Sequence, residues 1–324
     1  ASVSNSKNVA LKDLKSIASN KWSDAIDIFT SEDVTVEDCF LRSGDDCIAV
    51  YGPRWNGKYW GDTGNVRNIN VSGCILMPDK ARPIHLGTHG DGTSPNGGRV
   101  IDNCAFKDID ILTYNTYAVD NSGAAQPMPI AFNACDGNMI TNIYFEDIRI
   151  QDGVTNQIVS MNISTTSYGS VVVPGRGINN VYFKDITYTN PNQSFSGLIK
   201  GYDRSDGTSS VTKNVTFENL VVNGEVVTNT EDANITIGNY AENIKFVGSG
   251  ESRYVYNPAI VPEDIWPEYC DYAQLSGATV SADYSENGSS PEAVKTKIPC
   301  GILILESESR TTRIRTATRS KALL

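Results

Sequence analysis

Two groups of aspartates lie close together near the start of the chain. Asp24 and Asp27 form the first group, Asp45 and Asp46 form the second, and Asp46 follows Asp24 by 22 residues. Neighbouring carboxylates repel each other, which raises the pKa of one of them. One carboxyl group can therefore stay protonated while its neighbour is ionised. Such a pair is what acid–base cleavage of a glycosidic bond needs: an acid for the leaving oxygen and a base for water. The aspartates therefore indicate acid–base chemistry, provided that the fold brings the two groups together.

A repeated strand pattern supplies the elements that would position them. The repeat reads Asn or Asp, an aliphatic residue or Cys, any residue, an apolar residue, any residue, and then usually Asp, Gly or Asn. Successive copies begin 25 to 39 residues apart, and their alternation of apolar and polar residues predicts short strands with one buried face. The copies begin at Asn8, Asp33, Asn68, Asn103, Asn142, Asn180, Asn214 and Asn243.

A single repeat cannot bury its apolar face, whereas copies stacked about 4.8 Å apart can. We therefore expect an all-β fold, a right-handed parallel β-helix of about eight turns. The Asn or Asp of each copy would occupy a corner, because these residues tolerate a left-handed backbone. A β-sandwich or a β-propeller is the alternative, although the blade signatures of a propeller are absent from the sequence.

The repeat pattern ends near residue 248. We expect residues 1–248 to form the β-helix domain, with its N-terminal turns missing. Residues 249–300 would form an irregular extension or an incomplete β-sandwich-like module, and residues 301–324 a disordered tail. An open end of a β-helix exposes an unpaired edge and favours self-association, whereas capped ends would leave a monomer.

A second set of short strands lies between the repeats and carries the aspartates. Aligned by their apolar residues, these strands share one core-facing column: Ile26, Ile48, Ile84 and Ile130. Asp24, Asp46 and Arg82 then share a column just before the strands, and Asp45 lies beside it. Nothing in the repeat explains stacked like charges, so we expect a small outer patch of carboxylates that performs chemistry. The alternatives are a solvated polar face and a cation site.

The stretches WSD at residues 22–24 and DDC at residues 45–47 resemble the N-T-D and D-D-C motifs of the polygalacturonase family, glycoside hydrolase family 28, and its dextranase-like β-helix relatives. The resemblance implies an inverting hydrolase. Asp45 would be the general acid, and Asp24 and Asp46 would activate water. Inversion predicts carboxyl groups roughly 6.5–9.5 Å apart, which leaves room for that water.

The sequence departs from the family where substrate is bound. Arg82 occupies the place of the histidine in the family's G-H-G motif, and His85 and His89 are the only histidines in the chain. We expect Arg82, His85, His89 and Asp27 to contact substrate. The R-I-K motif, which holds the substrate carboxylate in pectin-degrading members, has no counterpart here. Its absence favours a neutral or differently charged glycan.

An aromatic-rich loop directly follows the second group of aspartates. Trp55, Tyr59 and Trp60 lie in this loop. Sugars stack their C–H faces on aromatic rings, so these residues are candidates for a wall of the substrate site. Ordinary packing within the loop is the alternative.

Charge and sequons bear on partners and location. The net charge of −11 argues against binding to nucleic acid or to an anionic membrane. Asn-x-Ser/Thr sites are typical of a secreted glycoprotein, and chance occurrence in a chain rich in Asn, Ser and Thr is the alternative. These sites are Asn70, Asn162, Asn192, Asn214, Asn234 and Asn287. The partner that we expect is a polysaccharide or oligosaccharide substrate. We expect no metal and no cofactor.

The seven cysteines allow several pairings. Cys39 and Cys74 occupy the same place in successive repeats, so they would stack either as a disulfide or as buried thiols. Cys270 and Cys300 are a second possible pair. No C-x-x-C metal motif is present in the sequence.

Two other functions compete with hydrolysis. A β-helix polysaccharide lyase would use a cation or Arg82 to neutralise a uronate. A carbohydrate-binding β-helix without catalysis would fit the replacement of the family's histidine by Arg82.

Overall fold

The computed structural model describes residues 1–18, 20, 22–53, 64–92, 99–114, 128–151, 157–165, 173–190 and 196–248. The expected extension at 249–300 and tail at 301–324 lie outside the described residues. The described residues form strands, turns and bends and include no helix. Accordingly, that part of the chain holds no helix that is long and apolar enough to cross a membrane. The described structure is all-β.

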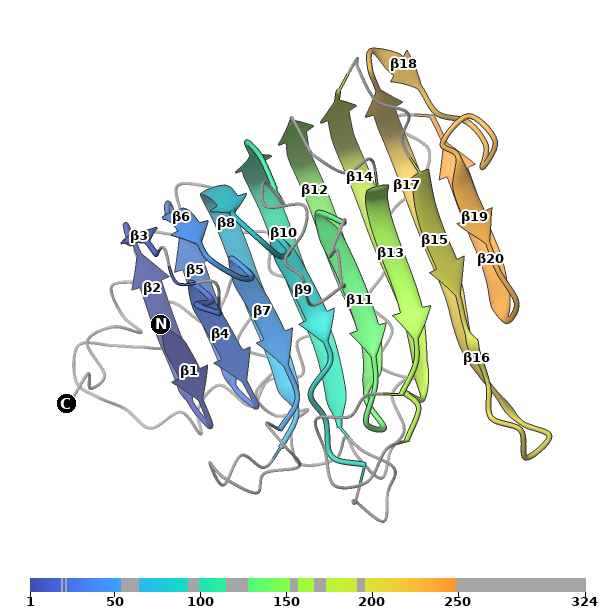
Figure 1. Ribbon diagram of the computed structural model, residues 1–324, viewed down its shortest axis with the longest axis horizontal. Helices are drawn as coiled ribbons and strands as arrows, with labels where there is room; N and C mark the ends of the chain where they lie inside the picture. Colours follow the sequence, from blue (N-terminus) through green and yellow to red (C-terminus); the bar gives the residue numbers. More distant parts are fainter. Residues whose placement is uncertain are drawn as a thin grey trace, which may run out of the picture.

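The first sheet contains eight short strands, and each neighbouring pair is parallel. Its spatial order follows the order of the chain, which is visible as a run of colours from blue to orange (Figure 1). The strands are β1 (Ser2–Ser4), β4 (Ile26–Phe29), β7 (Ile48–Tyr51), β9 (Ile84–Gly87), β11 (Ile130–Ala134), β13 (Gln157–Ile163), β15 (Ser196–Lys200) and β19 (Ile235–Ile237).

The second sheet contains twelve strands and carries all eight copies of the repeat. Its pairs are parallel, except that β17 pairs antiparallel with β16 and β18. A β-sandwich or a β-propeller, both built from antiparallel strands, is therefore ruled out for this region. The strands are β2 (Lys7–Lys12), β3 (Lys15–Ile17), β5 (Glu32–Glu37), β6 (Phe40–Ser43), β8 (Val66–Pro78), β10 (Val100–Ile111), β12 (Met139–Gln151), β14 (Gly177–Thr189), β16 (Tyr202–Asp203), β17 (Ser209–Val222), β18 (Glu225–Val226) and β20 (Ala241–Val247).

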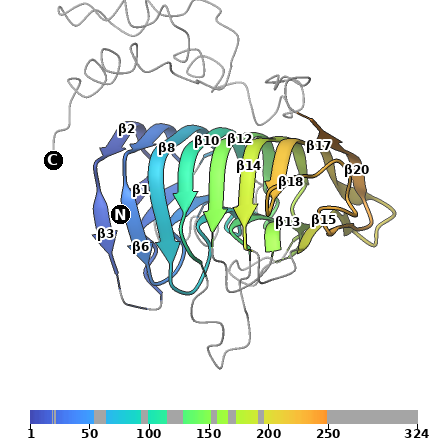
Figure 2. The same ribbon diagram turned by 90° about the horizontal axis from the view of Figure 1, so that it is seen from above.

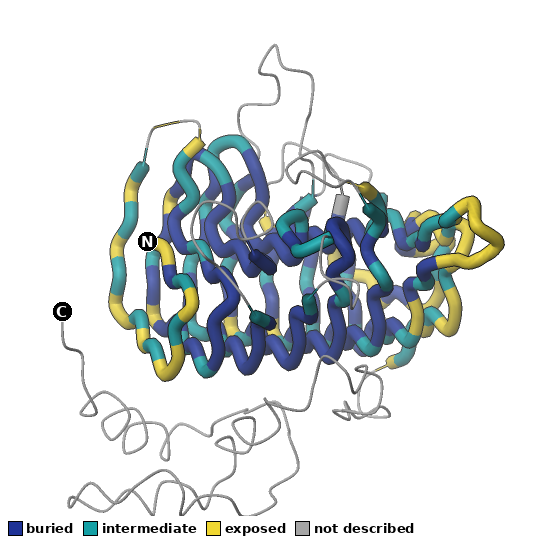
Figure 3. Tube along the Cα trace, turned by 90° about the horizontal axis from the view of Figure 1, so that it is seen from below, coloured by how far each residue is buried: buried dark blue, intermediate teal, exposed yellow. Residues whose placement is uncertain are grey.

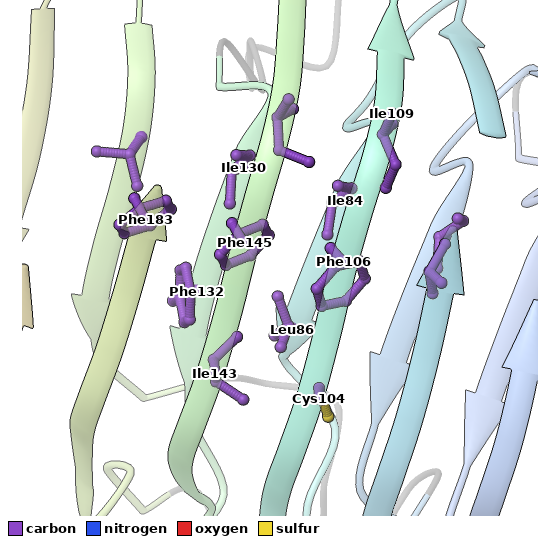
Figure 4. Close-up of a cluster of buried hydrophobic side chains, with 14 of the residues drawn as sticks. Ile84, Leu86, Cys104, Phe106, Ile109, Ile130, Phe132, Ile143, Phe145 and Phe183 are labelled. Atoms are coloured by element: carbon purple, nitrogen blue, oxygen red, sulfur yellow. The ribbon is translucent and has the colours of Figure 1, made fainter. Parts of the chain in front are cut away.

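The chain passes back and forth between the two sheets, and the core lies between them (Figures 2 and 3). One column of the core is a stack of phenylalanines from β10, β12, β14, β17 and β20, whose ring centroids lie 4.6 to 4.9 Å apart. This separation matches the spacing of neighbouring strands, about 4.8 Å, so each ring packs on the same residue of the next strand. Figure 4 shows Phe106, Phe145 and Phe183 of this stack, with Phe132 of β11 beside them.

The corner positions of the repeat have the predicted left-handed backbone. The first residue of all eight copies has a φ between 53° and 56°. Several of these side chains bond the corner residue of the neighbouring strand and so form short ladders: Nδ2 of Asn103 donates to Oδ1 of Asn68 at 2.7 Å, and Nδ2 of Asn180 donates to Oδ1 of Asn142 at 2.7 Å. Asn suits this place because its amide both donates and accepts while its backbone tolerates positive φ.

Cys39 and Cys74 stack as predicted, but they are free thiols that contact each other by a hydrogen bond. The buried-thiol alternative therefore describes this pair, and the disulfide alternative does not. Cys47, Cys104 and Cys135 are also buried free thiols. Cys270 and Cys300 lie outside the described residues.

Candidate functional site

Pairing in the first sheet confirms the alignment that placed the aspartates. Ile48 of β7 pairs with Ile26 of β4 on one side and with Ile84 of β9 on the other, and Ile84 pairs with Ile130 of β11. These isoleucines are buried, so the residues that alternate with them face away from the core. The residues just before the strands consequently lie one above another.

Asp24, Asp46 and Arg82 form this column and are linked by hydrogen bonds. The backbone N–H of Asp46 donates to Oδ1 of Asp24 at 2.9 Å, and the backbone N–H of Arg82 donates to Oδ1 of Asp46 at 2.8 Å. Each carboxylate thus accepts the N–H of the next residue in the column. Asp45 is held beside them, because its N–H donates to the carbonyl oxygen of Ser23 at 3.1 Å.

The column brings three carboxyl groups into one cluster. One oxygen from each of Asp24, Asp45 and Asp46 lies within 4.8 Å of the other two. The Asp27 side chain joins the cluster through a hydrogen bond to Asp24. These oxygens approach one another more closely than the roughly 6.5–9.5 Å between carboxyl groups that inversion predicts. Three oxygens at this spacing are also able to bind a cation.

Asp46 is the most buried member of the cluster, with 3% of its surface exposed. Its Oδ2 accepts a hydrogen bond from the Tyr51 hydroxyl at 2.9 Å and lies 2.7 Å from Nδ1 of His85 and 3.5 Å from Nη1 of Arg82. Burial alone would raise the pKa of Asp46, but the contacts with His85 and Arg82 outweigh burial and lower it. Asp46 is therefore ionised.

His85 is oriented by the same network and is almost fully buried. Burial and the Arg82 guanidinium lower the pKa of His85, against the opposing effect of Asp46. Its Nε2 lies 2.7 Å from the hydroxyl of Thr88 and 3.1 Å from Nδ2 of Asn133. Its Nδ1 lies 2.7 Å from Oδ2 of Asp46 and 3.0 Å from Nη1 of Arg82, so both ring nitrogens are held by polar partners. His85 therefore contacts Asp46 directly, and its expected contact with substrate stays a prediction.

Asp24 and Asp45 hold their protons more tightly than an ordinary aspartate does. Burial, followed by repulsion from Asp46 and Asp27, raises the pKa of Asp24 to about 9. Burial and repulsion from Asp46 raise the pKa of Asp45 to about 6, although the cations of Arg82 and Lys80 oppose the rise. At mildly acidic pH the cluster therefore holds a protonated Asp24, a protonated Asp45 and an ionised Asp46.

Tyr51 belongs to the site although the sequence did not single it out. It lies two residues after Ala49 and so shares the outward direction of that residue on β7. Following the outward side of β7 from Ala49 to the next residue on that side would have found Tyr51. Its hydroxyl bonds Asp46, and its ring packs against His85 at a centroid distance of 5.2 Å.

His89 occupies a supporting place. Its ring packs on Tyr51 at 5.1 Å and on Phe29 at 5.9 Å between centroids, and its carbonyl oxygen accepts the N–H of Gly52 at 3.0 Å. The expected substrate wall of Trp55, Tyr59 and Trp60 lies outside the described residues.

No protein-family model matches this chain, and no curated protein matches it.

Proposed function

We propose that the protein is a secreted glycoside hydrolase that cleaves a polysaccharide or oligosaccharide with inversion. The observation that carries this proposal is the cluster of Asp24, Asp45 and Asp46, whose pKa values differ widely within one small patch. Carboxyl groups with separated pKa values supply the acid and the base that this reaction needs. The proposal also rests on the motif resemblance at residues 22–24 and 45–47.

For the fold we propose a right-handed parallel β-helix of about eight turns. Each copy of the repeat lies on a separate strand of the second sheet, and the chain returns to the first sheet between most copies. Parallel pairing in both sheets and the ladder of corner asparagines support this architecture.

Asp45 acts as the general acid in the proposed reaction. Its pKa of about 6 leaves it protonated in mild acid, and it is less buried than Asp46. It gives its proton to the glycosidic oxygen as the bond from that oxygen to the anomeric carbon breaks. Asp24 and Asp46 together hold one proton and one negative charge, and such a pair can accept a proton from water. The remaining hydroxide bonds to the anomeric carbon.

The burial of Asp46 supports inversion over retention. A retaining enzyme needs an ionised carboxylate that reaches the anomeric carbon. Asp46 is the ionised member, yet it is 3% exposed and both of its oxygens accept hydrogen bonds. It therefore acts through water, even though the nearest oxygens of the cluster lie within 4.8 Å. The lack of an R-I-K motif favours a neutral or differently charged glycan as substrate.

Substitution of the general acid tests the proposal. Asp45→Asn should lower hydrolysis by at least about a hundredfold, because a proton donor is lost, while the fold is retained. The assay incubates purified protein with a panel of polysaccharides and detects new reducing ends. Asp13→Asn, at an exposed aspartate outside the cluster, is the matched control. Full activity of Asp45→Asn would refute the assignment, and NMR of the first-formed anomer distinguishes inversion from retention.

Two other outcomes would redirect the proposal. Arg82 beside Asp46, together with three oxygens able to hold a cation, favours the lyase as second candidate. Unsaturated products that absorb in the ultraviolet and disappear with chelator would identify a lyase. Glycan binding without turnover, unchanged by Asp45→Asn, would identify a binding protein.

A further inference from the structure

Trp22 is an exposed aromatic residue beside the carboxylate cluster. It lies two residues before Asp24, and 61% of its surface is exposed. An exposed indole near a polar cluster offers a flat apolar face to a ligand that has one apolar side. The motif at residues 22–24 assigns a role to Asp24 and none to the ring of Trp22.

The turn that carries Trp22 is bonded to the general acid. The N–H of Ser23 donates to the carbonyl oxygen of Asn20 at 3.0 Å, and the N–H of Asp45 donates to the carbonyl oxygen of Ser23 at 3.1 Å. A Cβ added to Gly44 would lie 1.7 Å from the carbonyl oxygen of Asn20, so the turn packs directly on the backbone before Asp45. The backbone that carries Trp22 is thereby fixed next to the backbone of Asp45.

Lys80 links the indole to the same carboxyl group. Its ammonium nitrogen lies 3.5 Å from the centroid of the Trp22 ring, a cation–π contact. The charge of Lys80 also works to lower the pKa of Asp45, so Lys80 is near both residues. The contact orients the ring, and the exposed fraction of 61% remains for another partner.

We infer that Trp22 is a stacking platform for the pyranose ring that occupies the site beside Asp45. The C–H face of a pyranose is apolar and rigid, and it packs on an indole as another aromatic ring would. This inference rests on the proposed hydrolase function and narrows its substrate class to pyranosides. Lys80 holds the indole in place from its own side of the ring.

Binding to defined polysaccharides tests the inference. The background is Asp45→Asn, in which turnover should be at least about a hundredfold slower. The probes are dextran, pullulan and polygalacturonate, with the furanoside inulin as the comparison. Affinity electrophoresis gives the Kd for each probe. Trp22→Ala should raise the Kd for the pyranoside that binds by at least about tenfold, the change that corresponds to about 1.4 kcal/mol of stacking. Trp22→Phe should recover part of the affinity.

Tyr240→Ala is the matched control, because Tyr240 is an exposed aromatic residue at the other end of the described chain, 38% exposed. It should leave binding unchanged. If the double variant Trp22→Ala/Asp45→Asn binds the probes as tightly as Asp45→Asn alone, the stacking role of Trp22 is overturned and the hydrolase proposal is left intact. Equal losses in Trp22→Ala and Tyr240→Ala would overturn it as well. A wild-type protein that neither binds nor cleaves any of the probes would overturn both.

Discussion

Replacing Asp24 by Asn should stabilise the protein at neutral pH and leave its stability unchanged in acid. Burial, followed by the charges of Asp46 and Asp27, raises the pKa of Asp24 from 3.8 to about 9. Between these two values the folded protein holds a proton on Asp24 that the unfolded chain releases. Stability from this proton is complete below pH 3.8 and is lost progressively as the pH rises toward about 9.

The size of the effect follows from proton linkage. Each pH unit above the unfolded pKa costs about 1.4 kcal/mol, so at pH 7 the full effect would be about 4 kcal/mol. Because Asp24 is only partly buried, screening by water reduces our expectation to about 2 kcal/mol. Asn does not titrate, and its oxygen can still accept the N–H of Asp46 as Asp24 does at 2.9 Å. The substitution therefore removes the cost and keeps the hydrogen bond.

Urea denaturation at about pH 4, 5.5 and 7 measures this difference directly. The free energy of unfolding of Asp24→Asn should match that of wild type at the lowest pH and exceed it increasingly above that. Asp13→Asn, which changes an exposed carboxylate outside the cluster, should show no such growth. A difference that is equal at all three pH values, or a loss of stability at neutral pH, would refute the raised pKa of Asp24.

Three further predictions concern the acid, a buried ion pair and the core. Hydrolysis should persist in acid and fall above about pH 6, because Asp45 then loses the proton it must donate; an activity maximum above pH 8 would contradict this role. Arg67→Ala should cost about 3–5 kcal/mol in urea denaturation, because it strands Asp102 in the interior, where both side chains are 0% exposed. Arg149→Ala, at an ion pair whose side chains are 32% and 58% exposed, should cost less than about 1 kcal/mol, and equal costs at the two sites would contradict the argument from burial. Phe145→Ala should cost about 3–5 kcal/mol by opening the phenylalanine stack, and a loss below about 1 kcal/mol would mean that the stack repacks.

The strands and corners were predictable because they depend on local rules. Alternation fixes which side chains are buried, and a left-handed corner selects Asn or Asp. Asn68 and Asn103 show both effects, since each has positive φ and their amides bond each other across neighbouring strands. The register of Ile26, Ile48 and Ile84 followed from the same alternation.

The polar network around Asp46 was only partly predictable. Alternation with the buried isoleucines puts Ala49 and His85 on the side of their strands that faces away from the core, and such a side is often exposed. Both residues are in fact almost fully buried, with exposed fractions of 0% and 1%. Parity tells which way a side chain points but not what covers it. The burial that lowers the pKa of His85, and the contact of Tyr51 with Asp46, therefore could not be read from spacing.

The cysteines show the same limit in another form. Stacking of Cys39 and Cys74 follows from their equal places in the repeat, but the sequence left thiols and a disulfide equally open. In the structure both cysteines are free thiols, and they lie side by side, joined by a hydrogen bond.

Stacking of the aspartates has a structural cause that the sequence did not suggest. Oδ1 of Asp24 accepts the N–H of Asp46, and Oδ1 of Asp46 accepts the N–H of Arg82, so each oxygen satisfies a backbone donor just before a strand. An amide oxygen would satisfy the same donors without bringing negative charges together. The scaffold therefore explains an oxygen at positions 24 and 46, but it does not explain the charge. The negative charge of Asp46 helps to keep a proton on Asp24, and holding that proton costs stability at neutral pH. This charge is the part of the cluster that we assign to chemistry.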